Sequence, residues 1–252
     1  MWRRYILGNP AFLMRALHDA MQTRRRQRPD RALCQKHLKA RGRRLHWWLS
    51  TRATPLGKRM LDIVGAGSAL LVAAPLMSLT ALAIRIESRG PVFFSQQRVG
   101  LRGTPFRLWK FRSMYTGAEA RKAELARQNE MAGGVLFKIR DDPRVTRVGR
   151  IIRRFSIDEL PQLWNVLRGD MALVGPRPAL PGEVAQYPLP ARRRLLARPG
   201  ITCIWQVSGR SNIPFEGQVA MDLEYIQTAN LVTDLRLLLK TVPAVISGSG
   251  AY

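Results

Sequence analysis

Carboxylates and arginines gather in the second half of the chain, in short stretches suited to work on phosphate groups. They lie in Asp141-Asp142-Pro143-Arg144, Ser156-Ile157-Asp158-Glu159-Leu160-Pro161-Gln162, Arg168-Gly169-Asp170-Met171 and Gly175-Pro176-Arg177-Pro178. A carboxylate can serve as a nucleophile or a magnesium ligand, and arginines bind phosphate oxygens through paired hydrogen bonds. These stretches hold the candidate functional residues.

Other catalytic classes are excluded by what the same part of the sequence lacks. All three histidines precede residue 58, and Cys203 is the only cysteine after it. A Ser-His-Asp triad, a Cys-His pair, a zinc site of the usual ligands and an HExxH helix are therefore unavailable within residues 60–252. The chain also contains no GxxxxGK[ST] loop and no GxGxxG fingerprint, which argues against a P-loop NTPase or a dinucleotide oxidoreductase.

The stretch around Asp158 has two interpretations. Ser156 followed three residues later by Glu159 is typical of a capping box, and Asp158 in the first turn favours the positive end of the helix dipole. This pattern predicts a helix over Ser156–Leu167. The same helix start can bind a phosphate through its free amide groups, with neighbouring arginines as cations. Capping and catalysis both remain open on these residues alone.

The elements that must position these groups are mostly helical. Turn signals and apolar runs predict short strands at 90–94 and 106–111, and helices at 116–129, 216–229 and 234–246. The predicted fold class is α/β of the α+β kind, with a compact catalytic domain that contains short β-strands.

The charge of the chain is large and uneven. Its 252 residues carry 42 Lys and Arg against 17 Asp and Glu, a net charge of +25, and residues 1–59 hold 16 of the basic residues with two acidic ones. Such a charge predicts anionic partners: nucleic acid, an anionic membrane surface or phosphorylated substrates. Residues 1–57 are either a solvated basic arm or an arm that binds a membrane surface or a partner. Two cysteines indicate a reducing compartment.

One long apolar run, Leu61 to Ile86, is long enough for a membrane helix. Pro75 at its middle removes a backbone donor and predicts a break between two halves. Both flanks are basic, and a spanning helix would export one of them. A re-entrant hairpin bent at Pro75 keeps both flanks on the cytoplasmic face and is favoured over a single span.

A series of motifs in the last 195 residues carries a resemblance. In chain order they are Lys58-Arg59-x-x-Asp62, Pro75, Gly90-Pro91-Val92-Phe93-Phe94-x-Gln96-Gln97-Arg98-x-Gly100, Lys110-Phe111-Arg112-Ser113-Met114, Asp142-Pro143-Arg144-x-Thr146-x-x-Gly149, Ser156-x-Asp158-Glu159-Leu160-Pro161-Gln162, Gly169-Asp170-Met171-x-Leu173-Val174-Gly175-Pro176-Arg177-Pro178, Arg198-Pro199-Gly200-Ile201-Thr202, Trp205-Gln206-Val207-Ser208-Gly209-Arg210 and Gly250-Ala251-Tyr252. The sequence over 58–252 thereby resembles the bacterial sugar transferase family, the polyprenyl-phosphate hexose-1-phosphate transferases or monotopic phosphoglycosyl transferases. Cys203 stands where the family commonly has Gly.

The resemblance implies a reaction, a cofactor and partners. A hexose 1-phosphate passes from a UDP-sugar to a polyprenyl phosphate such as undecaprenyl phosphate, with release of UMP. The step begins exopolysaccharide, capsule or O-antigen assembly on the cytoplasmic face of the bacterial inner membrane. The implied partners are the UDP-sugar, polyprenyl phosphate and membrane lipid, with a homodimer as an option. The implied cofactor is Mg²⁺, and no nucleic acid is expected.

The resemblance also implies roles for single residues. Asp158 is the nucleophile that forms an aspartyl phosphosugar, and Glu159 helps to hold the magnesium ion. The candidates for binding the donor are Arg177 with its neighbour Pro176, Arg144, Lys110 and Arg112, and the arginines have the alternative of ordinary surface or ion-pair residues. Lys58, Arg59 and Asp62 are expected to fix the membrane hairpin at the lipid headgroups.

The expected organisation has three parts: a basic arm at 1–57, a re-entrant membrane hairpin at 58–89 and a cytosolic catalytic domain at 90–252. Residues 58–252 together form the family's catalytic unit. The competing hypothesis is a non-enzymatic, membrane-anchored basic adaptor that binds nucleic acid or anionic lipid through residues 1–57. The acidic and arginine motifs of the body argue against it, because a simple electrostatic binder does not need them.

Overall fold

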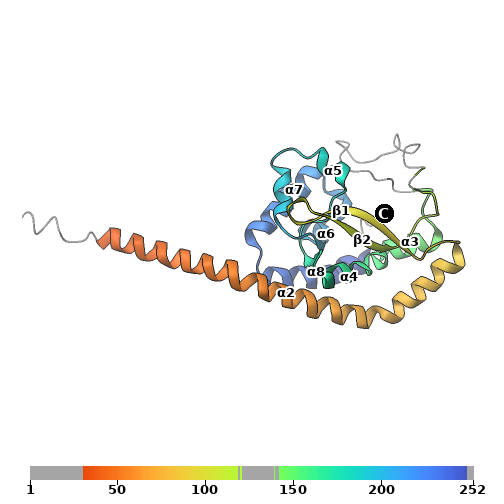
Figure 1. Ribbon diagram of the computed structural model, residues 1–252, viewed down its shortest axis with the longest axis horizontal. Coiled ribbons are helices and arrows are strands. Elements are labelled where there is room, and N and C mark those ends of the chain that lie inside the picture. The colour runs from red at the N-terminus through yellow and green to blue at the C-terminus, as the bar shows by residue number, and fades with distance from the viewer. Residues whose placement is uncertain (1–30, 119, 121–138, 140–141, 249–252) are drawn as a thin grey trace, which may run out of the picture. The chain divides into compact units, whose positions relative to one another are not determined.

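The computed structural model describes the backbone of residues 31–118, 120, 139 and 142–248, and the side chains from residue 56 onward within these ranges except Ser211. Two compact units divide the chain, residues 1–53 and 54–252. The described part of the first unit is helical. The second unit contains all the candidate site residues, and the description below is confined to it (Figure 1).

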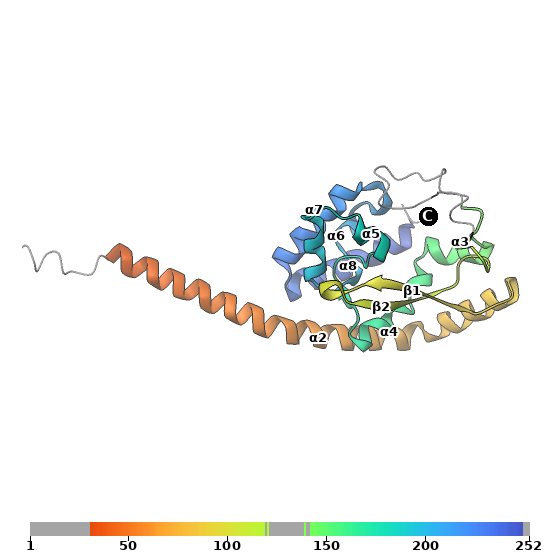
Figure 2. The same ribbon diagram turned by 45° about the horizontal axis from the view of Figure 1, so that its top comes forward.

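The apolar run lies in helix α2 (Arg31–Glu87), which continues through Pro75 without interruption. Residues 56–87 are long and apolar enough to cross a membrane, and most of their surface is not covered by protein. Leu71, Val72, Leu79 and Ile86 are among the exposed side chains. Figure 2 shows this orange-to-yellow part of α2 curving beneath α4. The predicted break at Pro75 is therefore not confirmed, although a proline inside a helix favours such bending because it removes one hydrogen bond.

Two small sheets carry site residues. In the first, β1 (Phe93–Val99) pairs antiparallel with β2 (Pro105–Phe111), so that Lys110 lies opposite Phe94. In the second, β3 (Ala172–Val174) pairs parallel with β4 (Gly200–Thr202). The strand predicted at 106–111 is confirmed, whereas the earlier one begins at Phe93 and extends to Val99.

Helices surround these sheets. They are α3 (Arg147–Arg154), α4 (Gln162–Arg168), α5 (Pro181–Ala185), α6 (Ile204–Ser208), α7 (Phe215–Thr228) and α8 (Leu231–Ser247), with 3₁₀ turns at Leu101–Gly103, Ile157–Glu159, Ala191–Leu196 and Arg210–Asn212. The helices predicted at 216–229 and 234–246 are confirmed by α7 and α8, and Pro243 lies inside α8. Most of the helix predicted at 116–129 lies outside the described residues. The mixed fold, mostly helical with short strands, is confirmed.

The main core joins α2 to α4, β3 and α8. Ala66 of α2 is fully buried, and it belongs to a cluster with Leu163 and Val166 of α4, Leu173 of β3 and Leu237 of α8. Burial of such side chains contributes about 1.5–3 kcal/mol each. A second cluster packs Ile84 near the end of α2 against Phe111 of β2 and Ile152 of α3. The apolar helix is thus built into the core along one face while its other face stays exposed.

The predicted contact of Lys58, Arg59 and Asp62 with lipid headgroups is not what the structure shows. The Lys58 ammonium forms an ion pair with Asp234 of α8 at 2.5 Å. The Arg59 guanidinium donates to backbone carbonyls of α4, and Asp62 accepts the backbone N–H of Leu173. Their polar groups face the protein, where Asp234 and backbone groups of α4 and β3 give each of them a partner.

Candidate active site

Asp158 and Glu159 lie in a 3₁₀ turn, Ile157–Glu159, and not in the first turn of an α-helix. Ser156 has the left-handed backbone conformation, with φ of 54°, and its side chain makes no capping hydrogen bond. The predicted capping box is therefore wrong, and the helix predicted over 156–167 is replaced by this turn and α4, which begins at Gln162. The Glu159 carboxylate is engaged by cations from distant segments instead of by the local backbone.

Two cations from different elements meet at Glu159. Lys110 Nζ of β2 lies 2.8 Å from Glu159 Oε1, and Arg177 Nη2 lies 3.1 Å from the same oxygen. Burial by itself raises the pKa of Glu159, but the charges of Lys110 and Arg177 and the hydrogen bonds they donate hold this pKa well below its ordinary value. Glu159 is consequently ionised throughout the neutral range.

Asp158 has a different environment although it is the next residue. Its Oδ2 lies 3.8 Å from Lys110 Nζ, and the residue is buried. Burial raises the pKa of Asp158 above its ordinary value, and the charge of Glu159 adds to this effect, while Lys110, Arg153 and Arg177 oppose it. Two adjacent carboxylates with pKa values moved in opposite directions are typical of functional sites.

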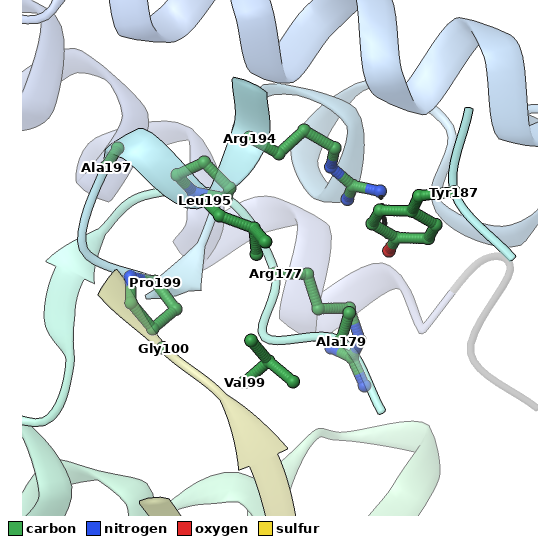
Figure 3. Close-up of a pocket in the computed structure, with 10 residues that line it drawn as sticks. Val99, Gly100, Arg177, Ala179, Tyr187, Arg194, Leu195, Ala197 and Pro199 are labelled. Atoms are coloured by element: carbon green, nitrogen blue, oxygen red, sulfur yellow. Dashed lines mark hydrogen bonds between the residues drawn. The ribbon is translucent and has the colours of Figure 1, made fainter. Parts of the chain in front are cut away.

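The two carboxylates line a cavity of about 1030 Å³. Of the donor-binding candidates, Lys110, Arg112, Arg144 and Arg177 line the same cavity. Pro176 does not line this cavity; together with Arg177 it lines a small cavity of about 10 Å³. Figure 3 shows the Arg177 side chain beside Val99 and Ala179 in this small cavity. Arg177 is thus packed between the small cavity and the large one.

Arg144 and Arg112 are held by the protein itself. Arg144 donates to both carboxylate oxygens of Asp142, at 2.6 to 3.2 Å, and to the carbonyl of Ala118. Arg112 donates to the backbone carbonyls of Ser88 and Arg89, just after the end of α2. Both side chains are buried, and their role toward a phosphate stays a prediction.

Arg153, one of the arginines expected to supply cations near Asp158, also lines the cavity, and so do Arg98 and Arg210, for which the sequence predicted no role. Within the described part of the chain, Arg98 Nε and Arg210 Nη1 are buried without a hydrogen-bond partner. Burial, assisted by the charge of Arg177, lowers the pKa of Arg98 to about 10. Arg98 and Arg210 each belong to a motif of the sequence, which was the available signal. Residue type alone could not distinguish them among so many arginines.

The donor set fits a magnesium ion that takes part of its ligands from a substrate. Among the described residues, no group of three or more His, Cys, Asp or Glu side chains is close enough to hold a metal. Asp158 and Glu159 offer two neighbouring carboxylates, whereas Asp142 is engaged by Arg144. Mg²⁺ is commonly bound by one or two carboxylates together with substrate phosphates and water. This pair of carboxylates is sufficient for that mode of binding.

Comparison with known proteins shows the family to which the chain is similar. The family model described as bacterial sugar transferase matches residues 53–248. The chain is 46% identical over 197 residues to the galactosyl transferase CpsE of Streptococcus agalactiae, which covers 78% of this chain and 43% of CpsE. It is 39% identical over 200 residues to the exopolysaccharide production protein ExoY of Rhizobium meliloti, covering 78% of this chain and 88% of ExoY. It is 44% identical over 208 residues to the UDP-glucose:undecaprenyl-phosphate glucose-1-phosphate transferase of Caulobacter vibrioides, covering 79% and 73%. The chain thus spans less than half of CpsE but most of ExoY.

Proposed function

This chain belongs to the bacterial sugar transferase family, and we propose that it transfers a hexose 1-phosphate from a UDP-sugar to a polyprenyl phosphate, with release of UMP. The observation that carries the proposal is the buried pair Asp158 and Glu159, with Lys110 and Arg177 against it in a large cavity. The name of the Caulobacter relative, which contains both UDP-glucose and undecaprenyl phosphate, supports this choice of donor and acceptor.

In the proposed first step, a carboxylate oxygen of Asp158 attacks the sugar-bearing phosphorus of the donor. An aspartyl O–P bond forms, the bond between this phosphorus and the bridging oxygen of the diphosphate breaks, and UMP leaves with the bridging oxygen and the electron pair. In the second step, a phosphate oxygen of the polyprenyl phosphate attacks the same phosphorus and releases the Asp158 carboxylate. A carboxylate can carry out this covalent route without a histidine base, which suits a body that has no histidine.

The cations around the pair have the task of stabilising charge. Arg177 and Lys110 are positioned to bind the donor diphosphate, and phosphoryl transfer depends chiefly on such positioning and charge neutralisation. Glu159 would help to hold Mg²⁺ together with the donor phosphates, and the bound ion would supply further positive charge beside the leaving UMP. Because Glu159 stays ionised near neutral pH, it suits the role of a metal ligand.

The membrane placement belongs to the same proposal. The exposed apolar face of α2 enters the cytoplasmic side of the bacterial inner membrane as a bent, re-entrant helix, which keeps the basic residues at both ends on one side. This arrangement brings the catalytic cavity to the surface where a polyprenyl phosphate lies. Cysteines introduced at Arg52 and Arg102 should both be shielded from an external label in intact cells. Labelling of only one of them would contradict the re-entrant placement.

The experiment is a nucleotide-release assay with purified protein, Mg²⁺, undecaprenyl phosphate and a panel of UDP-sugars. We expect acceptor-dependent UMP with at least one sugar, and its loss in Asp158→Asn. Release of UDP would instead indicate ordinary glycosyl transfer and contradict the mechanism. An absence of release with every donor, together with salt-sensitive nucleic-acid binding by the protein, would favour the basic adaptor.

A further inference from the structure

One turn of α2 makes polar contacts with both segments that lead to the catalytic groups. Lys58, Arg59 and Asp62 have the spacing i, i+1 and i+4, so Lys58 and Asp62 share a face of the helix. We call these three residues the α2 clamp. Their partners lie more than 100 residues away in sequence, on α4, β3 and α8.

Arg59 holds the end of α4. Its Nη1 donates to the carbonyl of Val166 at 2.7 Å, and its Nη2 donates to the carbonyl of Leu167 at 2.7 Å. The last four carbonyls of a helix have no partner within the helix, and a cation is favourable there. The bidentate contact therefore fixes both the position and the direction of α4, which begins three residues after Glu159.

Lys58 and Asp62 hold the free edge of β3. The other edge of β3 pairs with β4, through Ala172 and Val174. Asp62 Oδ1 accepts the N–H of Leu173 at 2.8 Å, and the carbonyl of Val174 accepts from Lys58 Nζ at 2.9 Å and from the Tyr225 hydroxyl at 3.0 Å. Asp62 is only 2% exposed. Buried backbone groups need hydrogen-bond partners. The side chains of Lys58 and Asp62, with the Tyr225 hydroxyl, supply them to two backbone groups of β3.

The segments that the α2 clamp contacts, α4 and β3, adjoin the carboxylates of the site and Arg177, respectively. Asp158 and Glu159 immediately precede α4, and Arg177 follows β3 by three residues. The 3.1 Å contact between Arg177 and Glu159 therefore depends on how far α4 and β3 are displaced along α2. We propose that Arg59 and Asp62 are positioning residues, which set the separation of the carboxylate pair from Arg177 and couple it to the membrane helix.

This inference rests on the proposed function, and its test uses the first half-reaction. With a UDP-sugar and Mg²⁺ but no acceptor, the enzyme should release a burst of UMP whose amplitude counts folded sites and whose rate reports the chemical step. Asp62→Leu keeps the branching at Cγ and removes the acceptor oxygens, whereas Asp62→Asn keeps an oxygen for the Leu173 N–H. Arg59→Leu removes the contact with α4. The matched control is Arg168→Leu, because Arg168 ends α4 with a side chain that is 57% exposed.

We expect Asp62→Leu and Arg59→Leu to keep the burst amplitude per folded protein and to lower the burst rate by roughly 10- to 100-fold, as small misplacements of reacting groups do. Asp62→Asn and Arg168→Leu should stay within about threefold of the wild-type rate, since neither loses the contact concerned. If Asp62→Leu does not fold, Arg59→Leu and Arg59→Lys carry the test alone, and Arg59→Lys should recover part of the rate.

Three results would overturn the inference. They are unchanged burst rates in the Leu variants, a loss of amplitude with the rate intact, and an Asp62→Asn variant as slow as Asp62→Leu. A wild-type protein without any burst would count against the proposed covalent function instead, so the two failures are distinguishable.

Discussion

The ammonium group of Lys110 lies 2.8 Å from Oε1 of Glu159, which joins β2 to the turn that carries the carboxylate pair. Both side chains are largely shielded from solvent, where such a charge pair interacts more strongly than at the surface. We expect a donor phosphate to take the place of the Glu159 carboxylate as the partner of Lys110 when the substrate binds. Substitution of Lys110 therefore perturbs the charges around both carboxylates while Asp158 itself stays in place.

Lys110→Met removes the charge while keeping a similar side-chain length. We expect kcat for UMP release to fall about 100-fold or more, as when one preorganised charge-stabilising donor is lost. The pKa of Asp158 should rise because the charge of Lys110, which opposes the effect of burial, is gone. The first step needs ionised Asp158, so the acid limb of the pH–rate profile should move to higher pH. Lys110→Arg should retain part of the activity. Wild-type kcat and pH profile in Lys110→Met would contradict this role.

Asn165 is a second link between β2 and α4. Its side chain is fully buried, Oδ1 accepts the N–H of Trp109 at 3.1 Å, and Nδ2 donates to the carbonyl of Arg107 at 2.7 Å. Asn165→Ala leaves both backbone groups unpaired, so we expect the free energy of unfolding to drop by roughly 2 to 5 kcal/mol. Thermal unfolding in detergent checks this. Because Asn165 Nδ2 also donates to Asp170 Oδ2 at 3.1 Å, Asn165→Asp would bring two carboxylates together and should lose at least as much. A loss below about 1 kcal/mol in Asn165→Ala would argue against these hydrogen bonds.

Local patterns in the sequence predicted the elements well where burial and periodicity agree. The strand at 106–111 and helices α7 and α8 follow from such patterns. The capping box at Ser156 failed for a physical reason. Its Glu159 carboxylate gains more from Lys110 and Arg177, which approach from 49 and 18 residues away, than from one backbone N–H. Sequence spacing gives no information about partners at such separations.

Gly200 lies where β4 approaches the end of β3 closely, just before Arg177. A Cβ atom added at Gly200 would lie 2.0 Å from the backbone nitrogen of Gly175, which no rotation of a side chain can relieve. We expect Gly200→Ala to cost about 3 kcal/mol or more, or to prevent folding. Gly182→Ala is the matched control in α5, since an added Cβ there meets nothing within 4 Å. Equal melting temperatures for the two variants would contradict this packing.

Cys203 should be chemically inert in the folded protein. It is fully buried, its Sγ donates to Gln206 Oε1, and burial raises the pKa of the thiol well above its ordinary value. A thiol reacts as its thiolate, so alkylation at pH 8 should leave Cys203 unlabelled until the protein is unfolded. Peptide mass spectrometry identifies the labelled position. Rapid labelling of Cys203 in native protein would show that this part of the body opens readily.

The placement of the clamp and of the cavity arginines illustrates what the sequence could not supply. Lys58, Arg59 and Asp62 beside an apolar run resemble flanking residues at a membrane surface, and only the structure reveals that their polar groups contact α4, β3 and α8. Among the described residues, Arg98 and Arg210 line the cavity and each has a buried nitrogen without a hydrogen-bond partner, a feature they share with Arg112. Both distinctions arise from tertiary contacts, which residue type and spacing do not encode.

The most direct test of the central claim is the intact mass of the protein after incubation with Mg²⁺ and a competent UDP-sugar in the absence of acceptor. Covalent catalysis by Asp158 predicts a species heavier by one hexosyl phosphoryl group, located on the peptide that contains Asp158. The species should be absent in Asp158→Asn and should disappear when undecaprenyl phosphate is added. Acceptor-dependent UMP release without any adduct, or an adduct that persists in Asp158→Asn, would contradict the account.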